Sequence, residues 1–288
     1  MKVAYHPGDL TPEPRSVAIG TFDGVHRGHR RVLEAAIAAG STPTVVTFDP
    51  HPRVALGNQV ELLTTLERRL ELFEELGVAD TLVVEFTPDT ARLEPEEFVD
   101  GTLRPIGTMV IVAGENFRFG RARAGDLDLL SMLGFDVRPV PLVEHVSSSQ
   151  LRHLLRAGEI ERAAALLGRP PELDGTVVTG DARGGTLGFP TANLSVDPQL
   201  LVPAYGIYAG AVHEHRAAIS VGTNPHYGGE ERRIEAFLLD FEGDLYGRRL
   251  VVELWKRLRD ERVFESEQEL IAQMARDVEE TRAAERPF

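Results

Sequence analysis

The chain has 288 residues and contains no cysteine. This absence excludes disulfides, zinc–thiolate sites, iron–sulfur clusters and catalysis by a thiol. Lysine is almost missing as well, because Lys2 and Lys256 are the only two, and arginine carries nearly all the positive charge. Acidic residues outnumber basic ones by 45 to 31, giving a formal net charge of −14. Nucleic-acid binding is therefore not expected as the main function.

Long apolar runs are missing too. No stretch approaches the roughly 18 consecutive apolar residues of a membrane-spanning helix. The first residues contain no apolar run of signal-peptide length, so we expect a cytoplasmic protein with no membrane partner. At a prior of roughly 150 residues per domain, the length predicts two domains.

The first half alternates short apolar runs with amphipathic helical patterns. Strands are predicted at 16–22, 42–48, 81–86 and 108–114. Helices are predicted at 29–39, at 64–76 and around 95–103. This alternation is typical of a parallel sheet covered on both faces, so we predict a Rossmann-like α/β domain.

From residue 175 onward, short β-type runs follow one another without helices between them. Strands are predicted at 175–180, 208–213, 217–222, 233–239 and 249–255, a spacing typical of an antiparallel barrel. A long terminal helix follows, capped by Ser266 with Glu269 in the capping-box position. Two short helices at 149–156 and 160–167 and the prolines after Arg169 indicate a boundary near residue 170. We therefore predict domains over 1–168 and 169–288.

A glycine-rich segment lies between the first strand and the first helix. Its glycines, which allow a ligand to approach the backbone closely, are Gly20, Gly24 and Gly28. The helix N-terminus behind them presents free N–H groups to an anion. His26 and His29 lie one helical turn apart, a spacing suited to two donors on a phosphate chain. A turn with surface histidines is the alternative, and a metal pair is less favoured because no third ligand is near.

A second glycine-rich segment covers residues 180–193. Such a segment can wrap a nucleotide, and Thr191 and Asn193 supply the hard oxygen ligands that Mg²⁺ prefers. A hairpin turn followed by a strand is the alternative interpretation. Glu235 lies within an apolar strand. Because successive side chains of a strand point to opposite faces, Glu235 lies on the face opposite to that of Ile234 and Ala236. A glutamate so placed most often faces solvent.

The N-terminal motifs resemble the HxGH nucleotidyltransferase superfamily, and most closely the adenylyltransferase half of bacterial bifunctional riboflavin kinase/FMN adenylyltransferases. The resemblance rests on His-Arg-Gly-His at 26–29, Thr-Phe-Asp-Pro-His-Pro at 47–52, Leu-Thr at 63–64, Gly-Glu-Asn-Phe-Arg-Phe-Gly at 114–120, Gly-Asp at 125–126 and Ser-Ser-Ser-Gln-Leu-Arg at 147–152. It implies that Ser148 and Arg152 contact the ATP phosphates and that Asn116 lies near the reacting phosphates. The last motif is usually Ser-Ser-Thr-x-Ile-Arg, and the change keeps the hydroxyl and the guanidinium.

The C-terminal half resembles the riboflavin kinase domain of the same family. The matching segments are Gly-Phe-Pro-Thr-Ala-Asn at 188–193, Tyr-Gly-Ile-Tyr-Ala at 205–209, Val-Gly-Thr-Asn-Pro at 221–225, Ile-Glu-Ala-Phe at 234–237, the run at 239–247, and Leu258-Arg259 with Phe264. This resemblance implies that Thr191 and Asn193 hold Mg-ATP and that Glu235 is the general base on the ribityl hydroxyl of riboflavin. Gly185 stands where many members have arginine, and His226 where many have threonine.

The resemblance implies an enzyme that phosphorylates riboflavin to FMN in the second domain and adenylylates FMN to FAD in the first. The predicted catalytic residues are Glu235, His26, His29, Asn116 and Arg152, and the predicted metal ligands are Thr191 and Asn193. The predicted nucleotide-binding residues are Gly20, Phe22, Asp23, Gly24, Gly28, Ser148, Gly180, Gly185, Gly188 and Pro190. Mg²⁺ is the expected cofactor. The expected partners are ATP, riboflavin and FMN, with weak self-association left open.

Two other functions are weighed against this one. An adenylyl- or cytidylyltransferase for another phosphate explains the paired histidines but leaves the whole C-terminal half unexplained. A non-catalytic flavin-binding protein with decayed sites is disfavoured, because the candidate base, metal ligands and paired histidines are all present.

Overall fold

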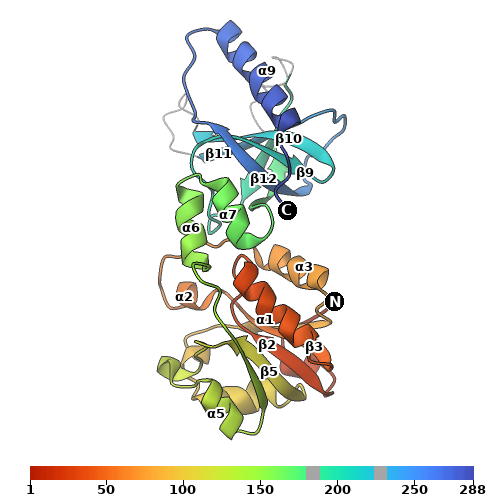
Figure 1. The fold of residues 1–288 in the computed structure, drawn as a ribbon, viewed down its shortest axis with the longest axis vertical. Helices are drawn as coiled ribbons and strands as arrows, with labels where there is room; N and C mark the ends of the chain where they lie inside the picture. Colours follow the sequence, from red (N-terminus) through yellow and green to blue (C-terminus); the bar gives the residue numbers. More distant parts are fainter. Residues whose placement is uncertain (180–188, 224–231) are drawn as a thin grey trace. The chain divides into compact units, whose positions relative to one another are not determined.

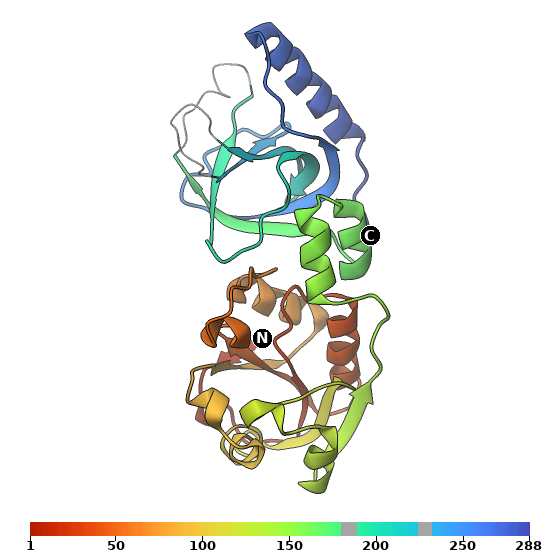
Figure 2. The same ribbon diagram turned by 90° about the vertical axis from the view of Figure 1, so that its left-hand side faces the viewer.

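The computed structural model describes residues 1–179, 189–223 and 232–288. The chain divides into two compact units, one formed by Met1–Val60 and Leu66–Ser147, the other by Glu61–Thr65 and Ser148–Phe288. Figures 1 and 2 show a parallel sheet with helices in the first unit and a closed barrel with helices packed against it in the second. Within the described residues, none of the helices has the length and apolar character needed to span a membrane.

The first unit is built on a six-stranded sheet in the order β1-β4-β3-β2-β5-β6. Every pair of neighbours is parallel, as predicted. The strands are β1 (Lys2–Ala4), β2 (Arg15–Ile19), β3 (Thr42–Asp49), β4 (Asp80–Glu85), β5 (Thr108–Gly114) and β6 (Asp136–Val140). The sequence analysis did not predict the edge strands β1 and β6. One has three residues, and the other contains Pro139 and no buried side chain.

Helices cover both faces of this sheet, because each central strand is apolar on both sides (Figure 1). Ala18 and Val45 face α1 (Arg27–Ile37) and α3 (Leu66–Leu76). Val17 and Val46 belong to the opposite layer, which includes α4, η3 and α5. The remaining short helices and those of the opposite layer are η1 (Pro7–Asp9), α2 (Pro52–Ala55), η2 (Thr90–Arg92), α4 (Pro95–Phe98), η3 (Val99–Leu103), η4 (Arg121–Arg123) and α5 (Leu127–Met132).

The second unit is a closed antiparallel barrel in the order β10-β11-β8-β7-β12-β9, which confirms the predicted fold. Its strands are β7 (Glu172–Val178), β8 (Ala192–Val196), β9 (Gly206–Val212), β10 (His215–Thr223), β11 (Arg232–Leu238) and β12 (Arg249–Arg259). In the described part of this unit the helices are α6 (Ser148–Arg156), α7 (Ile160–Leu167) and α9 (Glu267–Ala283). Ser266 caps α9 as predicted, since its side chain accepts from the Glu269 N–H.

Two helices that the sequence analysis placed before the boundary near residue 170 pack on the barrel. Leu151 and Leu154 of α6, and Ile160 of α7, belong to the same hydrophobic core as the barrel interior. A short stretch from the first half joins this unit as well, because the Leu62 N–H bonds the Gln199 carbonyl and the Leu62 carbonyl accepts from Leu201. The compact units therefore divide at 147/148, while 168/169 stays a prediction for the division of function.

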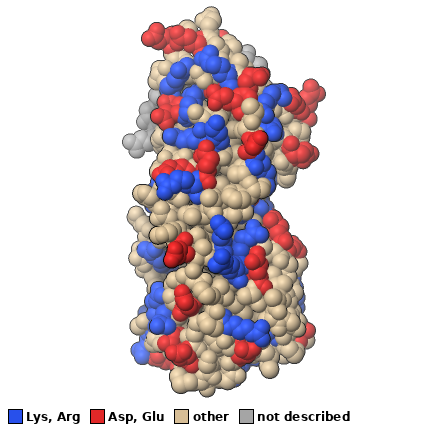
Figure 3. All heavy atoms as spheres, in the orientation of Figure 1, with Lys and Arg blue, Asp and Glu red and all other residues tan. Residues whose placement is uncertain are grey.

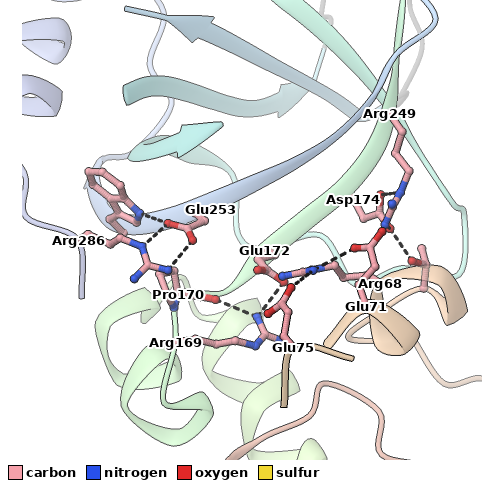
Figure 4. Close-up of polar contacts among 12 residues, drawn as sticks. Arg68, Glu71, Glu75, Arg169, Pro170, Glu172, Asp174, Arg249, Glu253 and Arg286 are labelled. Carbon is pink, nitrogen blue, oxygen red and sulfur yellow. Dashed lines mark hydrogen bonds and ion pairs between the residues drawn. The ribbon is translucent and has the colours of Figure 1, made fainter. Parts of the chain in front are cut away.

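Ion pairs fasten the barrel strands and the C-terminal residues (Figure 4). Asp174 of β7 is buried and receives both arms of Arg249 of β12, over 2.8 and 2.9 Å. Glu253 accepts from Trp255 at 2.7 Å and from two nitrogens of Arg286 at 2.7 and 2.9 Å. Partial burial raises the pKa of Glu253, but the bonds from Arg286 and Trp255 outweigh it and hold the pKa below its usual value.

Candidate active sites

A cavity of about 360 Å³ lies in the second unit, between the outer face of strands β10 and β11 and helix α9. It brings together Thr191, Asn193 and Glu235, three residues that the sequence analysis singled out. Thr191 Oγ1 donates a hydrogen bond to Glu235 Oε2 over 3.2 Å. A hydroxyl, an amide and a carboxylate therefore meet at one place, where the start of β8 pairs with β11.

Strand alternation explains why Glu235 reaches this cavity. Its neighbours Ile234 and Ala236 are buried in the barrel core, so Glu235 points outward. Its register partners are Asn193 on β8 and Ser220 on β10, which also line the cavity. From the sequence, a glutamate on the outward face of this strand was expected to face solvent. Here it forms the floor of the cavity beneath α9.

The oxygen atoms of this cluster fit a hard divalent cation. A threonine hydroxyl and an asparagine amide oxygen are suitable Mg²⁺ ligands when substrate phosphates supply the rest. Among the described residues, no cluster of three or more His, Cys, Asp or Glu side chains is placed to hold a metal. Pro190 is exposed just before Thr191. The predicted positions Gly180, Gly185 and Gly188, and the departure at His226, lie outside the described residues.

The rest of the cavity wall is mostly apolar. Phe189 and Phe237 meet edge to face, with ring centroids 5.4 Å apart. The other apolar wall residues are Ile207, Ala218, Ile219, Phe264, Leu270, Met274 and Val278. The cavity thus combines the oxygen atoms of Thr191, Asn193 and Glu235 with an apolar surface, and the charged side chains of Arg233, Arg259, Glu261, Arg262 and Asp277 also line it. Such a cavity suits a substrate with a flat apolar ring and a hydroxylated end.

In the first unit, the chain turns sharply after β2 and then enters α1. Phe22 and Val25 have positive φ angles of 53° and 41°, which is uncommon for residues with a side chain. Gly24, at φ 85°, adopts this region without steric cost. The turn buries Phe22, Asp23 and His26, all below a tenth exposed. Strained backbone of this kind is concentrated at functional sites.

His26 and His29 lie face to face at the start of α1. Their ring centroids are 3.5 Å apart, with an interplanar angle of 16°. His26 is the helix N-cap, because its Nδ1 accepts from the His29 N–H over 3.2 Å. A neutral ring with Nδ1 as acceptor carries its proton on Nε2. A Cβ at Gly28 would lie 3.2 Å from the His26 ring, so this glycine makes room for the histidine.

Both imidazoles are neutral at neutral pH. Burial lowers the pKa of His26 from 6.5 to about 4. Burial, together with the nearby charges of His26 and Arg69, puts the pKa of His29 well below its usual value. The Nδ1 atom of His29 is buried without a hydrogen-bond partner in the described part of the chain. Buried unsatisfied groups are rare in proteins and indicate a position that a ligand completes.

The sequence analysis missed Arg69, a buried cation beside this turn. Its guanidinium donates to the carbonyl of Thr21 at 2.8 Å and lies 3.7 Å from Asp49 Oδ1. Burial lowers the pKa of Arg69, while the charges of Asp23 and Asp49 oppose that change. Arg69 lies four residues before Phe73, on the buried face of α3. An arginine on a helix's apolar face was the available signal.

The remaining predicted residues lie in two places. Asn116 is exposed after β5, the strand that pairs with β2, so it shares the carboxyl edge of the sheet with the turn that holds His26. Gly20 starts that turn and donates its N–H to the Val46 carbonyl. Ser148 and Arg152 belong to α6 of the second unit, where Arg152 is buried and donates to the Glu61 carbonyl over 2.6 Å.

Comparison with known proteins matches the two halves to two families. Residues 9–151 match the family model described as FAD synthetase, and residues 167–285 match the model described as Riboflavin kinase. Each match contains one of the two sites: the paired histidines lie in the first and the Thr191–Glu235 pair in the second.

Individual relatives match nearly the whole chain. A curated bifunctional riboflavin kinase/FMN adenylyltransferase of Listeria monocytogenes is 36% identical and covers 98% of both chains. The protein of that name from Bacillus subtilis is 35% identical, over 96% of this chain and 95% of the relative. A solved structure from Streptococcus pneumoniae, described as a macrolide-efflux protein, is 32% identical with a TM-score of 0.86, covering 97% of this chain and 98% of that one.

Proposed function

The chain belongs to the family of bifunctional riboflavin kinase/FMN adenylyltransferases, and from this membership we propose how its residues carry out the two reactions. The protein phosphorylates riboflavin to FMN with one ATP and adenylylates FMN to FAD with another, releasing pyrophosphate. We assign the kinase to residues 169–288 and the adenylyltransferase to residues 1–168.

The hydrogen bond between Thr191 and Glu235 carries the kinase assignment. Riboflavin lies in the cavity with its ring against the apolar wall and its ribityl chain toward Glu235. Glu235 removes the proton from the terminal hydroxyl, and the oxygen attacks the γ-phosphorus of ATP in line. The new oxygen–phosphorus bond forms as the bond to the β-phosphate oxygen breaks, which releases ADP.

Thr191 and Asn193 are the residues that would hold Mg²⁺ together with the ATP phosphates. Their neutral oxygens leave most of the coordination to phosphate and water, which is the usual Mg²⁺ arrangement. When bound, the ion offsets the negative charge that develops on the phosphate oxygens. The two residues flank Glu235, since Thr191 donates to its carboxylate and Asn193 is its cross-strand partner.

The paired histidines carry the adenylyl step. A phosphate oxygen of FMN attacks the α-phosphorus of ATP, and pyrophosphate leaves. Because His26 Nδ1 is occupied by the helix cap, its Nε2–H is free to donate to the phosphates even when the ring is neutral. Arg69 adds buried positive charge near the turn. The nucleotide site is shaped by the residues of the turn, namely Gly20, Phe22, Asp23, Gly24 and Gly28. The phosphate contacts that the family resemblance implies are assigned to Asn116, Ser148 and Arg152.

We propose that the partners are small molecules and that the enzyme works in the cytoplasm. On the face shown in Figure 3, basic and acidic side chains are interspersed on each unit. The formal net charge of −14 also disfavours a polyanionic partner such as nucleic acid.

Product analysis tests the function directly. Purified protein given riboflavin and Mg-ATP should release one ADP and one pyrophosphate for each FAD formed, and neither when riboflavin is omitted. ADP without pyrophosphate would contradict the adenylyl assignment. Pyrophosphate formed with no consumption of riboflavin or FMN would favour an adenylyltransferase for another phosphate. Flavin binding with no product would favour a non-catalytic protein.

A further inference from the structure

Helix α9 carries two stripes of residues with the same spacing, and only the polar one is buried. The buried stripe consists of Gln273, Asp277 and Thr281, which are 8%, 4% and 0% exposed. The apolar stripe is half-buried, lines the cavity and consists of Leu270, Met274 and Val278. A surface helix normally buries its apolar stripe. Here the polar stripe attaches the helix to the barrel, and the apolar stripe faces the cavity that contains Glu235, which Asp277 and Arg259 also line.

Asp277 is the centre of the polar attachment. Its carboxylate receives Nε of Arg259 at 3.0 Å and Nη2 at 2.8 Å, a two-armed contact with the last residue of β12. Gln273 donates to the same carboxylate over 2.8 Å. Thr281 Oγ1 donates to the Asp277 backbone carbonyl over 2.7 Å. The pairing therefore fixes both where α9 lies on β12 and how it is rotated.

The same network reaches the segment that connects β12 to α9. The side-chain oxygen of Gln273 accepts from Arg262 at 3.0 Å and from Arg276 at 2.7 Å. The guanidinium groups of Arg259 and Arg262 lie 5.8 and 4.5 Å from the ring centroid of Phe264. Phe264 and Arg262 line the cavity. The network around the buried Asp277 carboxylate therefore connects α9 to the segment that precedes it, and both form part of the cavity wall.

A buried ion pair of this kind is a poor device for stability alone, because well-packed apolar residues often do as well or better. A charge pair with defined geometry does, however, specify one arrangement over others. On the barrel side of the cavity, Asn193 and Glu235 are fixed by the strand ladder, and Thr191 is held by its bond to Glu235. The helix side is held by the Asp277 network and, near the end of α9, by Arg216 of β10, which donates to the Thr281 carbonyl over 3.2 Å and to the Ala284 carbonyl.

We propose that Asp277 is a positioning residue for riboflavin. It holds α9 in the rotation that presents the apolar stripe and Phe264 to the isoalloxazine ring, and it does not touch the hydroxyl that reacts. The inference rests on the proposed function, because it takes riboflavin as the occupant of this cavity. It separates two tasks within one site: the barrel performs the chemistry, and the network around Asp277 sets the affinity for the ring.

The test is Asp277→Asn, which keeps the side chain's shape and removes its charge. Steady-state kinetics with Mg-ATP and riboflavin fluorescence titrations give KM, kcat and the flavin dissociation constant. We expect KM and the dissociation constant for riboflavin to rise about tenfold or more, with kcat within about threefold and KM for ATP unchanged. Combining Asp277→Asn with Arg259→Gln should add little, since the two residues act as a unit.

Asp240→Asn is the matched control. The Asp240 carboxylate accepts from both arms of Arg282, over 2.6 and 2.7 Å. Arg282 lies on α9, and this pair is not among the described residues that line the cavity. This variant should keep both riboflavin constants within about twofold. Gln273→Met provides a milder break of the network should Asp277→Asn fail to fold, and it should also raise KM for riboflavin.

Three outcomes would overturn the inference. The first is an unchanged riboflavin KM in folded Asp277→Asn, or in Gln273→Met if Asp277→Asn does not fold. The second is an equal effect in Asp240→Asn. The third is a fall in kcat with unchanged KM. Failure of the wild-type protein to form FMN would instead contradict the proposed function itself.

Discussion

The hydroxyl of Thr191 donates to Oε2 of Glu235 over 3.2 Å, although the two residues are 44 positions apart in the sequence. This bond occupies one carboxylate oxygen and leaves Oε1 to accept the proton of a substrate hydroxyl. It also fixes the distance between the proposed metal ligand and the proposed base. The two groups that must act together on the attacking oxygen and the phosphate are therefore held by the barrel itself.

The packing of α6 and α7 predicts where the kinase half can be cut. A fragment beginning at Ser148 keeps the apolar residues of both helices in the barrel core, whereas one beginning at Arg169 removes Leu151, Leu154 and Ile160 from it. We expect both fragments to contain the kinase residues but the longer one to unfold more than about 5 °C higher. Thermal melts monitored by circular dichroism make the comparison.

Riboflavin phosphorylation by the same fragments is the second readout. The longer fragment should form FMN without residues 1–147. Equal melting temperatures would mean that the two helices do not stabilise the barrel. A folded Ser148–Phe288 fragment without kinase activity would count against assigning the kinase to the C-terminal half.

The buried histidines predict a loss of stability in mild acid. The pKa of His26 is lowered from 6.5 to about 4, so between these pH values the unfolded chain binds a proton that the folded chain does not. The free energy of unfolding is therefore unaffected by protonation of His26 above pH 6.5 and decreases as the pH falls toward 4. For His26 alone the loss is on the order of 3 kcal/mol. Denaturant titrations from pH 7.5 to 5 should show about 2 kcal/mol of this loss, because the remainder falls below pH 5.

His26→Asn is the control for this titration. An asparagine oxygen still caps α1 by accepting the His29 N–H, but it has no proton to gain. The variant should lose less stability than the wild type over the same pH range. Parallel pH profiles would show that protonation of His26 does not contribute.

Most of the architecture could be predicted from the sequence because periodicity reports burial. The four central strands of the sheet are apolar on both faces, and the antiparallel runs of the second half alternate, so the parallel sheet and the antiparallel barrel were both predicted as fold types. Strand β8 was not predicted, because Ala192–Val196 is short and has one buried residue, Leu194. Edge strand β1 is similarly short. Neighbouring strands, not local sequence, define such segments.

The sites were predicted less completely. Motif spacing identified the residues that meet, including Thr191 with Glu235 and His26 with His29. It did not identify Arg69 or Asp277, because neither belongs to a motif and the burial of a charged side chain on a helix depends on partners that motif spacing does not reveal. Their partners lie far away in the sequence or in another element, as with Asp277 and Arg259.

Separate rates for the two reactions in Glu235→Gln and His29→Ala test the central claim, that one chain carries two independent sites. Glu235→Gln keeps the size of the side chain and removes the base, so FMN formation from riboflavin should fall by about 10²–10⁴ while FAD formation from supplied FMN continues. His29→Ala should do the reverse, with FAD formation reduced by about 10²–10³ and FMN formation unchanged. Chromatographic separation of riboflavin, FMN and FAD gives both rates from the same preparations. If either substitution abolished both reactions in a protein still folded by circular dichroism, the account of two sites would be contradicted.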